Sequence, residues 1–197
     1  MLGLLAPTDA RWADAAVADL DAVLRDHAHC EMKAASHAMS LAARHPDDLA
    51  LVRKLVAIAQ EELAHFDRVL AILASRGLAL GTPPVDEYAA TLRGRVAKLP
   101  RAEGALVDRL LVCALIEARS CERFKLLVER LGEGHELFAF YKELFAAEAR
   151  HFREFLELAI QASSEGVAHT RLQSIASIEA EIVRERARAT DRASIHG

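Results

Sequence analysis

Two long segments of the sequence, residues 51–72 and 137–158, repeat core-type positions at alternating intervals of four and three. This spacing places the apolar side chains on one face of an α-helix, and it predicts helices that pack along a shared core. Each apolar face is interrupted by one Glu-x-x-His pair, which is Glu62 with His65 in the first segment and Glu148 with His151 in the second. The chain is therefore predicted to be helical and to carry polar groups in its interior.

The rest of the chain divides into helix-sized segments separated by breaks. We predict helices at about 9–44, 47–76, 87–99, 102–131, 136–162 and 167–190. Residues 77–86 contain two glycines and two prolines, which is typical of a long connection between helices. The length of 197 residues suits one domain with a sizeable core. The prediction is a single all-α domain over residues 1–197, with a four-helix bundle at about 9–162 and an additional outer C-terminal helix at about 167–190.

The charge balance and the cysteines narrow the classes of function. The net charge of −4 argues against a generally basic surface for nucleic acid. The first seven residues lack the features of an export signal, and charges interrupt every apolar run before membrane-spanning length. Cys30, Cys113 and Cys121 are odd in number and lack zinc-type spacing. These features predict a cytoplasmic protein with no membrane partner.

The two Glu-x-x-His pairs belong to a larger internal repeat. Glu31 precedes Glu62 by 31 residues, and Glu117 precedes Glu148 by the same distance, so the two halves coincide under one shift of 86 residues. Both leading glutamates occupy apolar-face positions of their helices. Glu122 competes with Glu117, but it is displaced by about 140° around the helix, and we therefore choose Glu117.

This set of side chains suits a pair of metal ions. Unpaired charges in a core cost several kcal/mol each, whereas four carboxylates can balance two divalent cations. Carboxylate oxygens with imidazole nitrogens favour iron or manganese over thiolate-binding metals. One Glu from each of two helices and Glu-x-x-His from two others is the known pattern of ferritin-like carboxylate proteins. The predicted ligands of a two-iron centre in a ferritin-like bundle are Glu31, Glu62, His65, Glu117, Glu148 and His151.

Four segments around these residues resemble one family. HAHCEMKAASHAMSL at 27–41, EELAHF at 61–66, LIEARSCERF at 115–124 and EARHF at 148–152 resemble the MiaE family of tRNA 2-methylthio-isopentenyladenosine hydroxylases. The resemblance implies an O2-dependent monooxygenase that hydroxylates the isopentenyl group of a modified adenosine next to the tRNA anticodon. It also implies that the six residues match the iron-ligand positions of the family. An external donor of the reductase or ferredoxin type must supply electrons, because the chain has no flavin or nucleotide fingerprint.

A tRNA substrate requires a local basic surface. Residues 88–101 carry Arg93, Arg95, Lys98 and Arg101 with no acidic residue among them. We take this segment as the candidate RNA contact, and an ordinary solvent-exposed segment is the alternative.

Three further alternatives remain open from the sequence. The same six ligands would suit a ferritin-like oxidase or peroxidase acting on iron or peroxide. A metal-free helical interaction module would instead pair the carboxylates with Arg119, Arg123 or Arg150. His27, one turn before Glu31, is either a group that supports this ligand or a core histidine.

Overall fold

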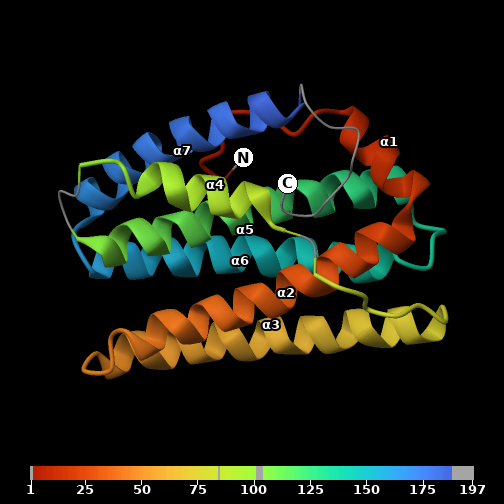
Figure 1. Cartoon of the computed structure of the whole chain (residues 1–197), viewed down its shortest axis with the longest axis horizontal. Helices are drawn as coiled ribbons and strands as arrows, with labels where there is room; N and C mark the ends of the chain where they lie inside the picture. The colour runs from red at the N-terminus through yellow and green to blue at the C-terminus, as the bar shows by residue number, and fades with distance from the viewer. Residues whose placement is uncertain (1, 84, 101–103, 188–197) are drawn as a thin grey trace. The chain divides into compact units, whose positions relative to one another are not determined.

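The computed structural model describes residues 2–83, 85–100 and 104–187, and these residues form helices, turns and irregular connections without any strand. Figure 1 shows the arrangement of the helices along the chain. They are α1 (Arg11–Ala18), α2 (Leu20–Ala43), α3 (Leu49–Ser75), α4 (Glu87–Val96), α5 (Ala105–Leu131), α6 (Phe138–Gln161) and α7 (Glu165–Ala187). The predicted all-α class, with an additional C-terminal helix, is confirmed.

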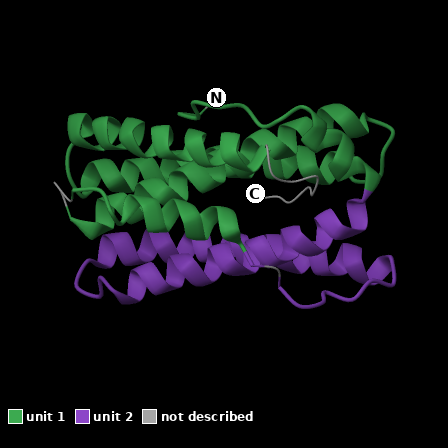
Figure 2. Ribbon diagram, turned by 45° about the horizontal axis from the view of Figure 1, so that its top comes forward, with its two compact units in different colours: residues 1–18, 86–197 green, residues 19–85 purple. Residues whose placement is uncertain are grey.

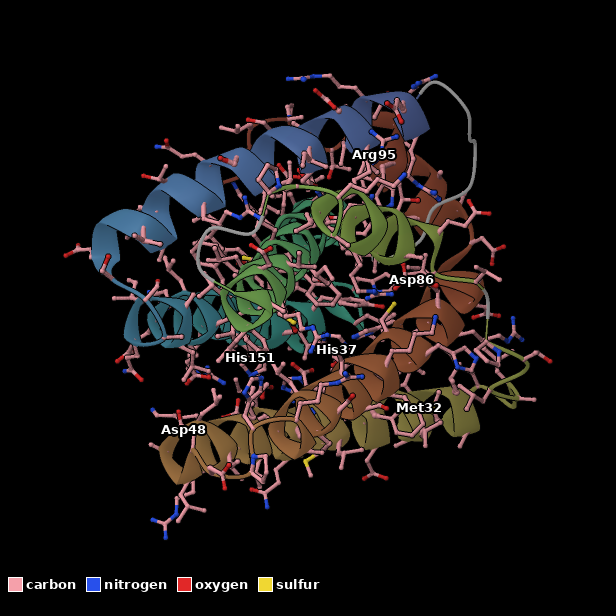
Figure 3. The ribbon with its side chains drawn as sticks, turned by 60° about the vertical axis from the view of Figure 1, so that its left-hand side comes forward. Met32, His37, Asp48, Asp86, Arg95 and His151 are labelled. Atoms are coloured by element: carbon pink, nitrogen blue, oxygen red, sulfur yellow. The ribbon has the colours of Figure 1, made fainter. Side chains whose placement is uncertain are left out.

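Aspartate caps define several of these helix ends. The side chain of Asp48 accepts a hydrogen bond from Leu51 N, and that of Asp86 accepts one from Ala89 N, each at 3.0 Å. Both aspartates are labelled in Figure 3 at the beginnings of α3 and α4. A cap of this kind satisfies a backbone N–H group that has no partner within the helix. These caps therefore fix where α3 and α4 begin, in agreement with the predicted segments.

The predicted continuous helix over 9–44 is wrong at one position. The structure interrupts it at Asp19, whose side chain accepts a hydrogen bond from Ala22 N at 3.1 Å and caps α2. Aspartate competes for backbone N–H groups in this way and favours helix beginnings over helix interiors. The apolar spacing continues across the interruption, so the sequence pattern did not reveal it.

The chain divides into two compact units, which Figure 2 shows in different colours. Unit 2 comprises residues 19–85 and consists of α2 and α3, which pack side by side. Unit 1 comprises residues 1–18 and 86–197, and within it α5 packs against α1, α4, α6 and α7. A single domain over 1–197 stays a prediction.

A buried charged network joins several segments of unit 1. Arg119 on α5 is fully buried, and its Nη2 donates to Glu179 Oε1 at 2.8 Å and to Ala6 O at 2.9 Å. Its Nη1 donates to Thr8 Oγ1 at 3.0 Å, and Tyr88 on α4 donates to Glu179 Oε1 at 2.9 Å. Because Glu179 lies on α7, this network fastens α4, α7 and the N-terminal segment to α5.

Within the ranges that the structure describes, no helix combines the length and apolar character needed to cross a membrane.

Candidate metal centre

Unit 2 brings together three of the predicted metal ligands. Glu31 lies on α2, whereas Glu62 and His65 lie one turn apart on α3, and all three are buried. The Nδ1 atom of His65 is 3.6 Å from Glu31 Oε2 and 3.7 Å from Glu62 Oε2. One candidate ligand atom from each residue lies within 4.8 Å of the other two. The two helices of the hairpin thus form one half of the predicted ligand set.

The electrostatics of this cluster suit a bound cation. Burial and the neighbouring Glu62 carboxylate raise the pKa of Glu31 to about 8. Burial alone would lower the pKa of His65, but the attraction of its imidazolium to the neighbouring Glu31 and Glu62 carboxylates outweighs this effect and raises the pKa to about 10. In the absence of a metal, Glu31 and His65 therefore each bind a proton more tightly than usual. A divalent cation in place of those protons would balance the buried carboxylates, so the donor set fits a metal ion.

Unit 1 contains the other three predicted ligands. Glu117 lies on α5, and Glu148 and His151 lie one turn apart on α6, which packs against α5. All three side chains are buried. Glu117 and His151 each offer a ligand atom within 4.8 Å of the other. Figure 3 labels His151 on α6. This unit therefore contains a second set of two glutamates and one histidine, which has the same composition as the set in unit 2.

The hydrogen bonds of Glu122 bear on the choice between Glu117 and Glu122. Oε2 of Glu122 accepts hydrogen bonds from Thr8 N at 3.0 Å and from Thr8 Oγ1 at 2.6 Å. The same oxygen also accepts a hydrogen bond from Arg119 Nη1. Glu122 thus takes part in the structural network around Arg119. This role supports Glu117 as the metal-ligand candidate on α5.

His27 is placed next to a predicted ligand. Its side chain is fully buried, and its Nε2 atom lies 2.6 Å from Glu31 Oε1. From the sequence alone, His27 was equally consistent with core packing and with support of Glu31. The observed contact favours support, and the separation of four residues in one helix was the signal for it.

Two of the basic residues in the predicted RNA-contact segment are exposed, and a third is paired with an acidic residue. Arg93 and Lys98 are exposed, whereas Arg95 on α4 is half-buried and its Nη2 atom lies 2.5 Å from Glu185 Oε2 on α7. Figure 3 labels Arg95 on α4. Arg101 lies outside the described residues. Residues 88–101 contain no acidic residue, so a count of charges in that segment could not reveal Glu185 as the partner of Arg95.

Comparison with known proteins decides the family. The model of the family described as tRNA-(MS[2]IO[6]A)-hydroxylase (MiaE) matches residues 2–194. The chain belongs to this family. A MiaE-family relative from Pseudomonas putida, named tRNA 2-(methylsulfanyl)-N(6)-isopentenyladenosine(37) hydroxylase, is 41% identical over 179 residues, which is 90% of this chain and 84% of the relative. A relative of the same name from Salmonella typhimurium is 34% identical over 134 residues, which is 68% of this chain but 47% of the relative.

One solved structure is also similar to this MiaE-family chain. It is described as protein 43 with aldehyde deformylating oxygenase activity from Synechococcus. The match has a TM-score of 0.88 at 35% sequence identity, and it covers 98% of this chain and 95% of that chain. The predicted ferritin-like fold class is confirmed.

Proposed function

We propose that this protein is a tRNA hydroxylase that adds one oxygen atom to the isopentenyl group of 2-(methylsulfanyl)-N6-isopentenyladenosine next to the anticodon. The observation that carries the proposal is the family match over residues 2–194, together with a hydroxylase relative that is 41% identical over most of the chain. Dioxygen is the proposed co-substrate, and an external reductase or ferredoxin-type donor supplies the electrons. The proposed location is the cytoplasm, where a tRNA substrate would be modified.

The proposed cofactor is a pair of iron ions. The ligands would be Glu31, Glu62 and His65 from unit 2, and Glu117, Glu148 and His151 from unit 1. Their burial, the matching composition of the two sets and the repeat under a shift of 86 residues all support this assignment. When bound, an iron pair supplies the reductive activation of dioxygen that a C–H hydroxylation requires.

The chain's own residues would hold the metals and limit the access of water. Buried carboxylates and imidazoles that are carried on helices can fix the ligand geometry with little reorganisation. Phe124 and Tyr141 are fully buried in unit 1, with ring centroids 5.4 Å apart, so aromatic surface forms part of the interior near α5 and α6. An interior of this kind suits an alkyl substituent and disfavours competing reactions with water.

The decisive experiment is a reaction with purified components. The protein would be loaded with ferrous iron, reduced chemically and supplied with dioxygen and tRNA that carries the isopentenyl nucleoside. Mass analysis of the digested nucleosides is expected to show one added oxygen atom, and isotope-labelled dioxygen should supply it. An unchanged nucleoside together with continued turnover of iron or peroxide would instead support the oxidase or peroxidase alternative. A protein that takes up no iron would support the metal-free interaction module.

For the tRNA contact, we propose the exposed residues Arg93 and Lys98. Arg95 is neutralised by Glu185, and it is therefore expected to contribute less than a local charge count suggests. Replacing Arg93 and Lys98 together with glutamate should weaken tRNA binding. The dependence of log Kd on log salt should also become shallower by about 1 for each lost phosphate contact.

A charge-matched control separates local binding from net charge. Arg53 and Lys54 are exposed on α3, and replacing both with glutamate changes the net charge by the same amount. Binding should be measured for both double variants over a range of salt concentrations. Equal losses in the two variants would show that only the overall charge matters, and this result would contradict the proposed contact.

A further inference from the structure

His27 makes a short contact with one oxygen of a predicted metal ligand. Its Nε2 atom is 2.6 Å from Glu31 Oε1, and the two side chains are separated by one turn of α2. The histidine side chain is fully buried, so water does not compete for this contact. The other oxygen of Glu31, Oε2, is the one nearer to His65 Nδ1, at 3.6 Å. The two carboxylate oxygens of Glu31 therefore face different partners.

The direction of this hydrogen bond follows from the chemistry of a metal ligand. An ionised carboxylate has no hydrogen to donate and can only accept. When Glu31 is ionised, as a metal ligand must be, Nε2 of His27 has to carry the hydrogen and donate it to Oε1. This donation holds Oε1 and leaves Oε2 directed towards the side of His65. This contact holds the carboxyl group in one orientation, so that Oε2 is presented when a metal binds.

The equivalent position in the second half of the repeat carries a different residue. A shift of 86 residues moves Glu31 onto Glu117 and moves His27 onto Cys113. Cys113 is buried on α5, but a thiol is a much weaker hydrogen-bond donor than an imidazole N–H group. The internal symmetry of the ligands therefore does not extend to the residues one turn before the leading glutamates.

We propose that His27 is a positioning residue that fixes Glu31 through Oε1 and presents Oε2 to the metal, and that this makes the two metal positions unequal. The position that uses Glu31 is the tighter one and fills first, because the contact with His27 already holds its carboxylate. The position that uses Glu117 fills second. This inference rests on the proposed two-metal centre.

The test is a metal titration of the full-length, metal-free protein with cobalt(II), whose visible absorption reports on its ligands. The unmodified protein should bind two ions in two resolved steps. His27→Leu removes the donor and should weaken the first step by about 10- to 100-fold, so that the two steps merge. His27→Gln retains an N–H group of similar reach and should restore most of the first step.

His29→Leu is the matched control within the same helix. His29 is also buried on α2, but it lies about 200° around the helix from Glu31. Its replacement should leave both binding steps unchanged. Thermal unfolding of each metal-free variant would show whether a fold defect accompanies any change in binding.

Each outcome decides a different question. Two unchanged steps in His27→Leu, or an equal loss in His29→Leu, would overturn the positioning role. If the His27→Gln protein unfolds normally but does not recover the first binding step, this result would also count against the positioning role. If the unmodified protein does not bind two ions, the proposed function itself fails. This outcome can be told apart from failure of the positioning role, in which the unmodified protein binds two ions and the His27 variants titrate in the same way.

Discussion

Replacing Glu117 with alanine is expected to leave the protein able to hold at most one tightly bound iron and to lower tRNA hydroxylation by more than about 100-fold. Glu117 is the only proposed metal ligand on α5, and its carboxylate lies within reach of His151 on α6. Even groups that merely support a metal ligand contribute about 10- to 100-fold to affinity or activity, so the loss of a ligand should cost more. Iron per chain and hydroxylated nucleoside per chain are the two quantities to measure.

Glu122→Gln is the control for this experiment. Glutamine keeps the shape of the side chain and can still accept hydrogen bonds from Thr8, but it loses the charge that faces Arg119. The variant should therefore be less stable than the unmodified protein and still load two irons. If Glu122→Gln lost an iron while Glu117→Ala retained both, the assignment of the α5 ligand would have to be reversed.

The helix pairs and the burial of the six candidate ligands could be predicted because both depend on local regularities. Residues four and three apart share a helix face regardless of what lies opposite, so a glutamate or histidine among apolar neighbours is visible in the sequence. Glu31, Glu62 and His65 are indeed buried together in one hairpin. A repeat of the same spacing in α5 and α6 predicted Glu117, Glu148 and His151, and these side chains are buried as well.

Pairings between distant segments could not be predicted in the same way. Arg119 and Glu179 are separated by 60 residues, and Arg95 and Glu185 by 90, so no periodic pattern links them. In the metal-free alternative, Arg119 was one of the arginines that could pair with the candidate metal-site carboxylates. The structure instead pairs it with Glu179 and Glu122. The interruption at Asp19 is a different case, because a single local capping hydrogen bond outweighs an apolar pattern that continues on both sides.

The ion pair between Arg119 and Glu179 leads to the second large expected effect. Replacing Glu179 with leucine should lower the free energy of unfolding by about 3–5 kcal/mol, because the buried guanidinium would lose its principal counter-charge. Both side chains are fully buried, and Nε and Nη2 of Arg119 donate to Glu179 at 2.8 to 3.0 Å. Tyr88 would lose its hydrogen-bond acceptor as well. Urea unfolding of the full-length protein measures this loss.

A double variant distinguishes the lost pairing from a simple packing defect. If an unpaired buried charge is the main cost, then replacing Arg119 with methionine in the Glu179→Leu background should recover part of the lost stability, even though it changes a second buried residue. Additive losses in the double variant would contradict this explanation. Iron per folded chain should remain unchanged in both variants, because Arg119 and Glu179 are not among the proposed ligands. Stability would then fall without loss of metal, whereas Glu117→Ala should lose metal, and the two roles of α5 would be separated by experiment.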